Sequence, residues 1–269
     1  MAGNFRQVTK SVWLVGCGGW GGQKEKFSRP SDSNVYLVDG GRELALVDAG
    51  LGPENHQILA NIKAAGFNPK KIRKIFLTHC HGDHSEAAAW LRDMTGGRIY
   101  AGPVTARALE EGERNLLGGM EPFVPFTPVT YRVDRVLADG EETTVGNLVQ
   151  KTIYTTGHSI DSICFVSEIG GRKVLFSGDT FIGRQTRPDR DNHTYPCVLG
   201  WLDGHWSDGL TRYVASLRKL QELKVDLALP GHGVPQNRKT AEIALKAGIK
   251  SLQRVLDDED LFHMFSVSR

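Results

Sequence analysis

The sequence predicts an α/β (α+β) fold in which two mixed β-sheets pack together with helices outside them. Strand patterns come first, then helices, then more strands and finally helices again, without a short-period repeat or a low-complexity linker. Many neighbouring strands are joined by tight glycine turns, which predicts antiparallel hairpins, whereas others are separated by helices, which predicts parallel pairs. This mixture favours two packed sheets over a uniform βα barrel. We predict a single domain over residues 1–269.

The first half of the chain is predicted to hold strands and helices in alternation. Short apolar runs bounded by glycine or polar residues indicate strands over Ser11–Gly16, Asn34–Asp39, Glu43–Asp48, Ile72–Leu77 and Arg98–Ala101. Helical spacing of apolar residues indicates helices over Pro53–Ala65, Ser85–Asp93 and Thr105–Leu117. Gly40 and Gly41 are expected to form a two-residue turn that pairs the second strand with the third.

The second half is dominated by strands until its last third. The strands are expected over Tyr131–Val136, Glu142–Val145, Leu148–Thr155, Ser162–Ile169, Lys173–Phe176 and Val225–Leu229. Asp139-Gly140, Gly146-Asn147 and Gly170-Gly171 supply the turns between them. Two helices are expected, over Leu210–Leu223 and from about Lys239 to Leu256.

Composition excludes several classes of partner. The net charge is only +2, which argues against nucleic acid. Apolar stretches are too short to span a membrane, and Met1–Lys10 lacks an apolar signal region, so a cytoplasmic location is expected. The four cysteines form no close CxxC pair and are expected to remain thiols in a reducing compartment.

The stretch richest in chemistry is Thr78–His84 (THCHGDH), directly after a predicted strand. Residues two apart in an extended chain project to the same side, so His79 and His81 can hold one ion together. Asp83 and His84 must point elsewhere once the chain bends, which suits a second ion beside the first. Unpaired buried polar groups are costly, so a cluster this dense has no packing rationale.

Three further candidates follow predicted strands, each directly after a glycine: His158, Asp179 and His232. Glycine lets the backbone turn sharply toward a ligand. A lone histidine is usually a hydrogen-bonded or surface residue, but the recurrence of the glycine indicates a shared site. With the cluster these residues make a nitrogen and oxygen donor set that suits zinc, iron or manganese.

These residues, together with Val47–Gly50 (VDAG), resemble the motifs of the metallo-β-lactamase superfamily, in particular its glyoxalase II-like and lactonase-like branches. The resemblance runs from about Asn34 to Pro235. It implies a four-layer αββα sandwich with the site along the shared edge of two sheets. It assigns one metal ion to His79, His81 and His158. It assigns a second ion to Asp83, His84 and His232. Asp179 would bridge both ions, and Asp48 would orient a ligand from behind. Two Zn²⁺ ions per chain are expected, with iron and manganese as alternatives.

The implied reaction is hydrolysis of a carboxylic ester, a thioester or a lactone. Two metal ions about 3.5–4 Å apart can hold a bridging hydroxide at neutral pH and polarise the carbonyl that it attacks. Asp83 and Asp179 are the predicted catalytic carboxylates, and Asp83 could receive a proton.

Two irregular segments are expected to recognise the substrate, Cys17–Ser33 and Ile182–Gly209. In the first, Trp20 is a candidate apolar flap, and the alternative is a surface loop with one packed tryptophan. The second gathers aromatic and cationic side chains, which favour an aromatic or anionic small molecule. Its candidate binding residues are Arg187, Tyr195, Trp201 and His205.

Three other functions stay open at this point. A mononuclear iron dioxygenase acting on a persulfide shares much of the motif set, and one iron per chain would favour it. A β-lactam hydrolase is disfavoured because such enzymes generally lack a bridging aspartate at the position of Asp179. A non-catalytic binding module is disfavoured because the ligand set is complete. The sequence also leaves homo-oligomerisation open.

Overall fold

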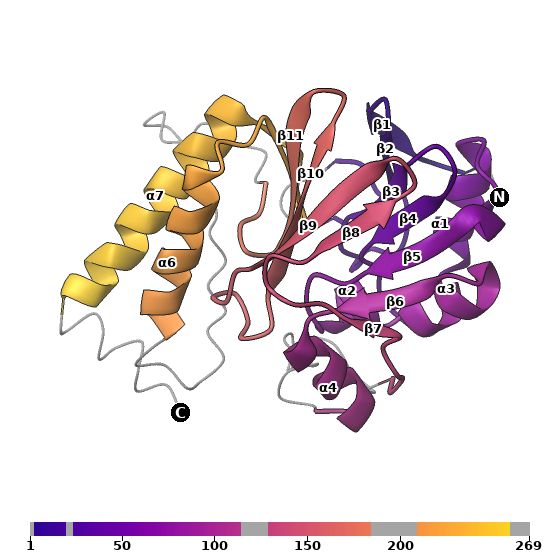
Figure 1. The fold of residues 1–269 in the computed structure, drawn as a ribbon, viewed down its shortest axis with the longest axis horizontal. Helices are drawn as coiled ribbons and strands as arrows, with labels where there is room; N and C mark the ends of the chain where they lie inside the picture. The colour runs from indigo at the N-terminus through magenta and orange to yellow at the C-terminus, as the bar shows by residue number, and fades with distance from the viewer. Residues whose placement is uncertain (1–2, 20–23, 114–128, 184–208, 259–269) are drawn as a thin grey trace.

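Two β-sheets packed face to face form the centre of the computed structural model (Figure 1). The structure describes residues 3–19, 24–113, 129–183 and 209–258. Within these residues one sheet has seven strands and the other has six. Helices lie against the outer face of each sheet, so the molecule has the four αββα layers that the sequence predicts.

The seven-stranded sheet is antiparallel in its first part and parallel in the rest. Its strands lie in chain order: β1 (Arg6–Thr9), β2 (Val12–Gly16), β3 (Val35–Asp39), β4 (Leu44–Val47), β5 (Ile72–Phe76), β6 (Arg98–Ala101) and β7 (Arg135–Val136). Helices cross over between the parallel strands, because such strands cannot be joined by a tight turn. They are α1 (His56–Ala64), the 3₁₀ turn η2 (Pro69–Lys71), α2 (Gly82–Ser85), α3 (Ala88–Thr95) and α4 (Pro103–Glu111).

The six-stranded sheet is a four-stranded antiparallel meander extended by one parallel strand and then by one antiparallel edge strand. Its strands are β8 (Glu142–Val145), β9 (Leu148–Tyr154), β10 (Ile163–Ile169), β11 (Arg172–Gly178), β12 (Leu227–Pro230) and β13 (Gln236–Asn237). The outer layer beside it consists of α6 (Gly209–Glu222) and α7 (Arg238–Asp257). Among the helices that the structure describes, none is both long and apolar enough to cross a membrane.

Aromatic side chains fill the space between the sheets. Phe76 of the seven-stranded sheet lies 5.2 Å from Phe165 of the six-stranded sheet, between ring centroids. Tyr36 of the seven-stranded sheet likewise contacts Phe176 of the six-stranded sheet, with 5.7 Å between ring centroids. Separate apolar clusters lie between each sheet and its helices. Burial on both faces explains why the central strands are almost continuously apolar in sequence.

Three helices differ from the sequence prediction. Helix α1 begins later than predicted, at His56, and the Asn55 side chain donates to Asp32 Oδ2 (2.9 Å) and makes no capping hydrogen bond. Helix α4 begins before the predicted Thr105 and ends at Glu111 instead of Leu117, because Gly112 adopts a left-handed conformation (φ 70°) there. The helix predicted over Ser85–Asp93 is two helices, α2 and α3. Between them the Ala87 N–H donates to the carbonyl of Gly50 (3.1 Å), which interrupts the helical pattern.

The strand predictions were wrong for one strand's length, for one turn and for two short strands. The run Tyr131–Val136 forms a strand only at its end, because the Tyr131 N–H donates to the carbonyl of Leu109 (3.1 Å) beside α4. The β3–β4 turn is longer than the predicted glycine pair, since Asp39 pairs with Leu44 across residues 40–43. Strands β1 and β13 were not predicted.

Candidate metal centre

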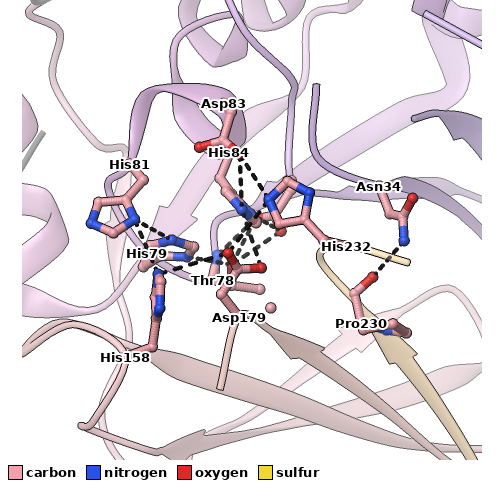
Figure 2. A network of polar contacts seen from close by, with 12 residues as sticks. Asn34, Thr78, His79, His81, Asp83, His84, His158, Asp179, Pro230 and His232 are labelled. Carbon is pink, nitrogen blue, oxygen red and sulfur yellow. Dashed lines mark hydrogen bonds and ion pairs between the residues drawn. The ribbon is translucent and has the colours of Figure 1, made fainter. Parts of the chain in front are cut away.

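Acidic and imidazole side chains converge where strands from both sheets end at one edge (Figure 2). They come from the segment after β5, which includes α2, and from the ends of β9, β11 and β12. The structure brings together all the ligands that the sequence predicts: His79, His81, Asp83, His84, His158, Asp179 and His232.

The first group consists of three buried histidines. His79 and His81 lie on the extended stretch after β5, and His79 Nε2 is 3.0 Å from His81 Nδ1. His158 reaches across from the other sheet and places its Nε2 3.1 Å from the same His81 atom. Three nitrogens from two sheets therefore face one point, as a site for a single ion requires.

The second group lies beside the first and contains carboxylates. The chain enters α2 after His81, so Asp83 and His84 lie in that helix rather than in the extended stretch. The His84 ring is nevertheless only 4.1 Å from the His79 ring, between centroids, so the two groups adjoin. His232 Nε2 lies 2.9 Å from Asp83 Oδ2. Asp179 lies between the groups: its Oδ2 is 3.4 Å from His232 Nε2 and 3.7 Å from His158 Nε2.

Two polar atoms that face each other in the cluster are buried without a hydrogen bond. Among the described residues, His84 Nε2 and Asp179 Oδ1 have less than 1 Å² of exposed surface and make no hydrogen bond, and they lie 3.5 Å apart. Leaving a buried polar atom unsatisfied costs about 1–3 kcal/mol. A bound cation would satisfy the lone pairs of such atoms, so the residues fit a metal ion. The nitrogen and oxygen donors suit zinc, iron or manganese.

The two groups differ in electrostatic character. Burial lowers the pKa of His79 well below its usual value, and it lowers that of His81. Burial would also lower the pKa of His84 and His232, but the carboxylates of Asp83 and Asp179 outweigh it and raise both. The negative charge is therefore concentrated on the second group, where it would stabilise a cation.

The buried carboxylate of Asp48 contacts a candidate ligand on the side away from the cluster's centre. Asp48 Oδ2 lies 2.8 Å from His84 Nδ1, and Asp48 Oδ1 accepts the Thr78 N–H at 2.9 Å. The Thr78 hydroxyl lies 3.0 Å from Asp48 Oδ2 and 3.0 Å from His79 Nδ1. Asp48 therefore contacts one ligand directly and another through Thr78.

Sequence reasoning missed two polar residues of the site. Thr78 was noted only as part of its motif. Asp161, which is 4% exposed, accepts hydrogen bonds next to three of the histidines. The polar run Ser159–Ser162 between two apolar strands was the available signal. A sequence cannot say which donors such a run will meet.

The predicted substrate residues cannot be placed. Trp20, Arg187, Tyr195, Trp201 and His205 lie outside the described residues. The described end of the Cys17–Ser33 segment does reach the site: the Ser33 N–H donates to the carbonyl of Asp83 at 3.2 Å.

A comparison with protein families agrees with the fold and the cluster. Residues 28–232 match the sequence profile of the metallo-β-lactamase superfamily. The chain therefore belongs to this superfamily, as the sequence motifs predict. Membership implies binding of a divalent metal, and the His/Asp groups described above are the candidates to hold it.

Two of the curated relatives come from species of Aspergillus. The atrochrysone carboxyl ACP thioesterase of Aspergillus fumigatus is 28% identical over 202 residues, which cover 75% of this chain and 50% of the relative. The lactamase-like protein adaB of Aspergillus niger is 26% identical over 236 residues, covering 84% of this chain and 56% of the relative. The chain thus spans about half the length of these relatives.

Solved structures share the fold over almost the whole chain. BJP-1, a subclass B3 metallo-β-lactamase of Bradyrhizobium japonicum, superposes with a TM-score of 0.70 at 21% identity, covering 98% of this chain and 96% of that one. GOB-18 from Elizabethkingia meningoseptica gives 0.67 at 20% identity, covering 94% and 90%. At such identities the likeness concerns the fold alone.

Proposed function

We propose that the protein is a dinuclear metal-dependent hydrolase that cleaves a thioester, a carboxylic ester or a lactone. The observation that carries this proposal is the convergence of two groups of buried ligands with Asp179 between them. The thioester is favoured because relatives from Aspergillus fumigatus and Passalora fulva are named as ACP thioesterases. Two Zn²⁺ ions are the proposed cofactor.

The chain's own contacts would prepare the ligands. The Thr78 hydroxyl has one proton, which it can donate to Asp48, so its oxygen is left to accept the Nδ1–H of His79. Asp48 likewise accepts the Nδ1–H of His84. In both rings the Nε2 lone pair is then free for a cation.

The remaining ligands complete the proposed site. His81 and His158 would hold an ion with His79, and His232 and Asp83 would hold another with His84. Asp179, which faces both groups, would bind both ions. When bound, the two ions would lower the pKa of water and polarise the substrate carbonyl. Asp83 is the candidate to receive a proton.

Metal content and substrate range test the proposal together. Protein purified without chelator should contain close to two transition-metal ions per chain by elemental analysis. It should hydrolyse at least one member of a panel of acyl thioesters, activated esters and lactones. Chelation should abolish this activity, and added Zn²⁺ should restore it. A metal-free protein that is fully active would contradict the proposal.

The same measurements separate the alternative functions. One iron per chain, with oxygen consumed in the presence of a persulfide, would indicate the dioxygenase. Turnover of a β-lactam but of no other substrate in the panel would indicate a β-lactamase. Two bound metals without turnover of any substrate would favour a binding module.

A further inference from the structure

Asp161 occupies an unusual place between the two sheets. It lies in the loop between β9 and β10, and both of its carboxylate oxygens accept hydrogen bonds from buried groups. Oδ2 accepts the Cys80 N–H and the Thr105 hydroxyl, each at 2.8 Å. Oδ1 accepts the Ser159 hydroxyl at 2.6 Å. Among the described residues no lysine or arginine forms an ion pair with it.

The donors to Asp161 adjoin the first group of ligands. Cys80 lies between His79 and His81 on the segment that follows β5 of the seven-stranded sheet. Ser159 directly follows His158 on the segment that leaves the six-stranded sheet. One carboxylate therefore ties together the two segments whose histidines must face a common ion. Thr105 of α4 anchors the carboxylate from a third side.

We propose that Asp161 is a positioning residue that sets the geometry of the His79, His81 and His158 group. Metal coordination tolerates errors of only about 0.2 Å in ligand distance, so segments from different sheets need a fixed spacing. Asp161 makes no hydrogen bond next to Asp83, His84 or His232 among the described contacts. Its effect should therefore be confined to one ion. The inference rests on the metal centre proposed above, but not on which bond the protein cleaves.

Metal titration of variants tests this inference without any substrate. The affinities of both ions are measured by competition between apoprotein and a chromophoric chelator for Zn²⁺. Two reference variants, His81→Ala and His232→Ala, show which ion is lost from which group. Asp161→Ala should weaken binding of the ion that His81→Ala loses by about 10-fold or more, the range for groups that orient metal ligands. The ion that His232→Ala loses should bind as in the wild type.

Asp161→Asn separates the contribution of hydrogen bonding and side-chain size from that of charge. The carboxamide oxygen can still accept from Cys80 and Thr105, and its NH₂ can donate to Ser159, whose hydroxyl can turn toward Ser162 Oγ at 2.7 Å. This variant should recover most of the affinity. Asp93→Ala is the control, because Asp93 is an exposed carboxylate that takes no part in the site. It should leave both affinities within about 3-fold of wild type, well inside the 10-fold effect expected above.

Each outcome decides the inference. Equal weakening of both ions in Asp161→Ala, or wild-type affinity for both, would overturn it. If Asp161→Ala does not fold, Ser159→Ala provides the test, because it keeps the carboxylate and removes only the Ser159 hydroxyl contacts with Asp161 and Ser162 beside His158, and it should still weaken the same ion selectively. A wild-type protein that binds no metal would remove the proposed centre itself, and the role of Asp161 with it.

Discussion

The imidazoles of His79 and His84 are oriented by contacts of their Nδ1 atoms with Thr78 and Asp48, and contacts of this kind decide what could be predicted. The candidate ligands were recognisable in the sequence, because the spacing in Thr78–His84 and the glycines before the other candidates are local signals. Thr78 and Asp161 were not, since each matters through a partner far away in sequence. Hydrogen-bond acceptors of this kind are defined only once the sheets have packed.

Asp179 provides the sharpest residue-scale prediction. Asp179→Ala removes the carboxylate that lies between His84, His158 and His232. We expect a loss of at least about 10²-fold in kcat/KM, together with weaker binding of metal, because an orienting and charge-balancing group is lost at a metal centre. The exposed residue Asp93 supplies the control variant, Asp93→Ala. Near-full turnover of Asp179→Ala would show that Asp179 is not a ligand.

The predicted substrate residues should affect binding rather than chemistry. Alanine substitution of Arg187, Tyr195 or Trp201 should raise KM and leave kcat nearly intact, because these side chains would contact ground state and transition state alike. His205 is the exception to watch, since an imidazole near the leaving group could donate a proton. Steady-state kinetics with metal content checked for each variant would reveal this as a fall in kcat at full occupancy. If none of the four changes KM, substrate recognition lies elsewhere, with Trp20 the next candidate.

At the scale of elements, strands with strong local patterns were predictable and weak ones were not. Long hairpins such as β10–β11 were found because apolar runs flank Gly170-Gly171, which both adopt positive φ. Strands β7 and β13 have two residues each, too few to show any periodicity. The break between α2 and α3 comes from the contact of Ala87 with Gly50, which helix propensity alone cannot reveal.

Helix α6 fixes the loop of one ligand through close packing. A Cβ at Gly157 would lie 2.1 Å from Tyr213 Cδ2, and Tyr213 is held by its hydroxyl on the carbonyl of Thr180 (2.7 Å). Gly157→Ala should therefore cost about 1–3 kcal/mol of stability, as overpacking does. Because His158 is the next residue, the substitution should also weaken metal binding. Denaturant unfolding and metal titration measure the two effects.

Gly140→Ala is the matched control for that experiment. Gly140 has positive φ (78°) with open space around it, so alanine there should cost about 1–2 kcal/mol through backbone strain alone. It should leave metal affinity unchanged. Equal metal affinity in the two variants would show that the packing of α6 does not position His158.

The whole molecule is held together at both ends of its sandwich. At the end that carries the candidate metal centre, His158 from one sheet contacts His81 from the other, and Asp161 accepts the Cys80 N–H. At the opposite end the β3–β4 turn meets the β8–β9 turn, where the Asn147 N–H donates to the carbonyl of Gly40 (2.9 Å). Glu43 adds to this junction by accepting from Lys74 Nζ and from the Gly146 N–H. The two sheets are therefore fixed relative to each other at both ends.

Glu43 gives this junction a pH dependence. Burial would raise the pKa of Glu43, but Lys74 and the Gly146 N–H outweigh it and lower the pKa. A carboxylate with a lowered pKa contributes its stability above its unfolded value and loses it as pH falls through the folded one. Glu43→Gln should therefore lower the free energy of unfolding by at most about 1 kcal/mol at pH 7, since the pair is partly solvated. The difference from wild type should vanish once the pH falls below the lowered, folded pKa of Glu43.

Urea unfolding of wild type and variant across this pH range checks the prediction. The exposed residue Glu222 supplies the control variant, Glu222→Gln, which should show no such trend. A destabilisation by Glu43→Gln that stays constant with pH would point to lost shape or hydrogen bonding rather than to charge.

The ligands are spread unevenly along the chain, with four inside Thr78–His84 and three far downstream. On an unfolded chain the local four can still close around an ion, whereas the other three cannot join them. An ion of the proposed centre would therefore keep some affinity for the unfolded polypeptide. Any such affinity subtracts from the stability that binding adds to the native state.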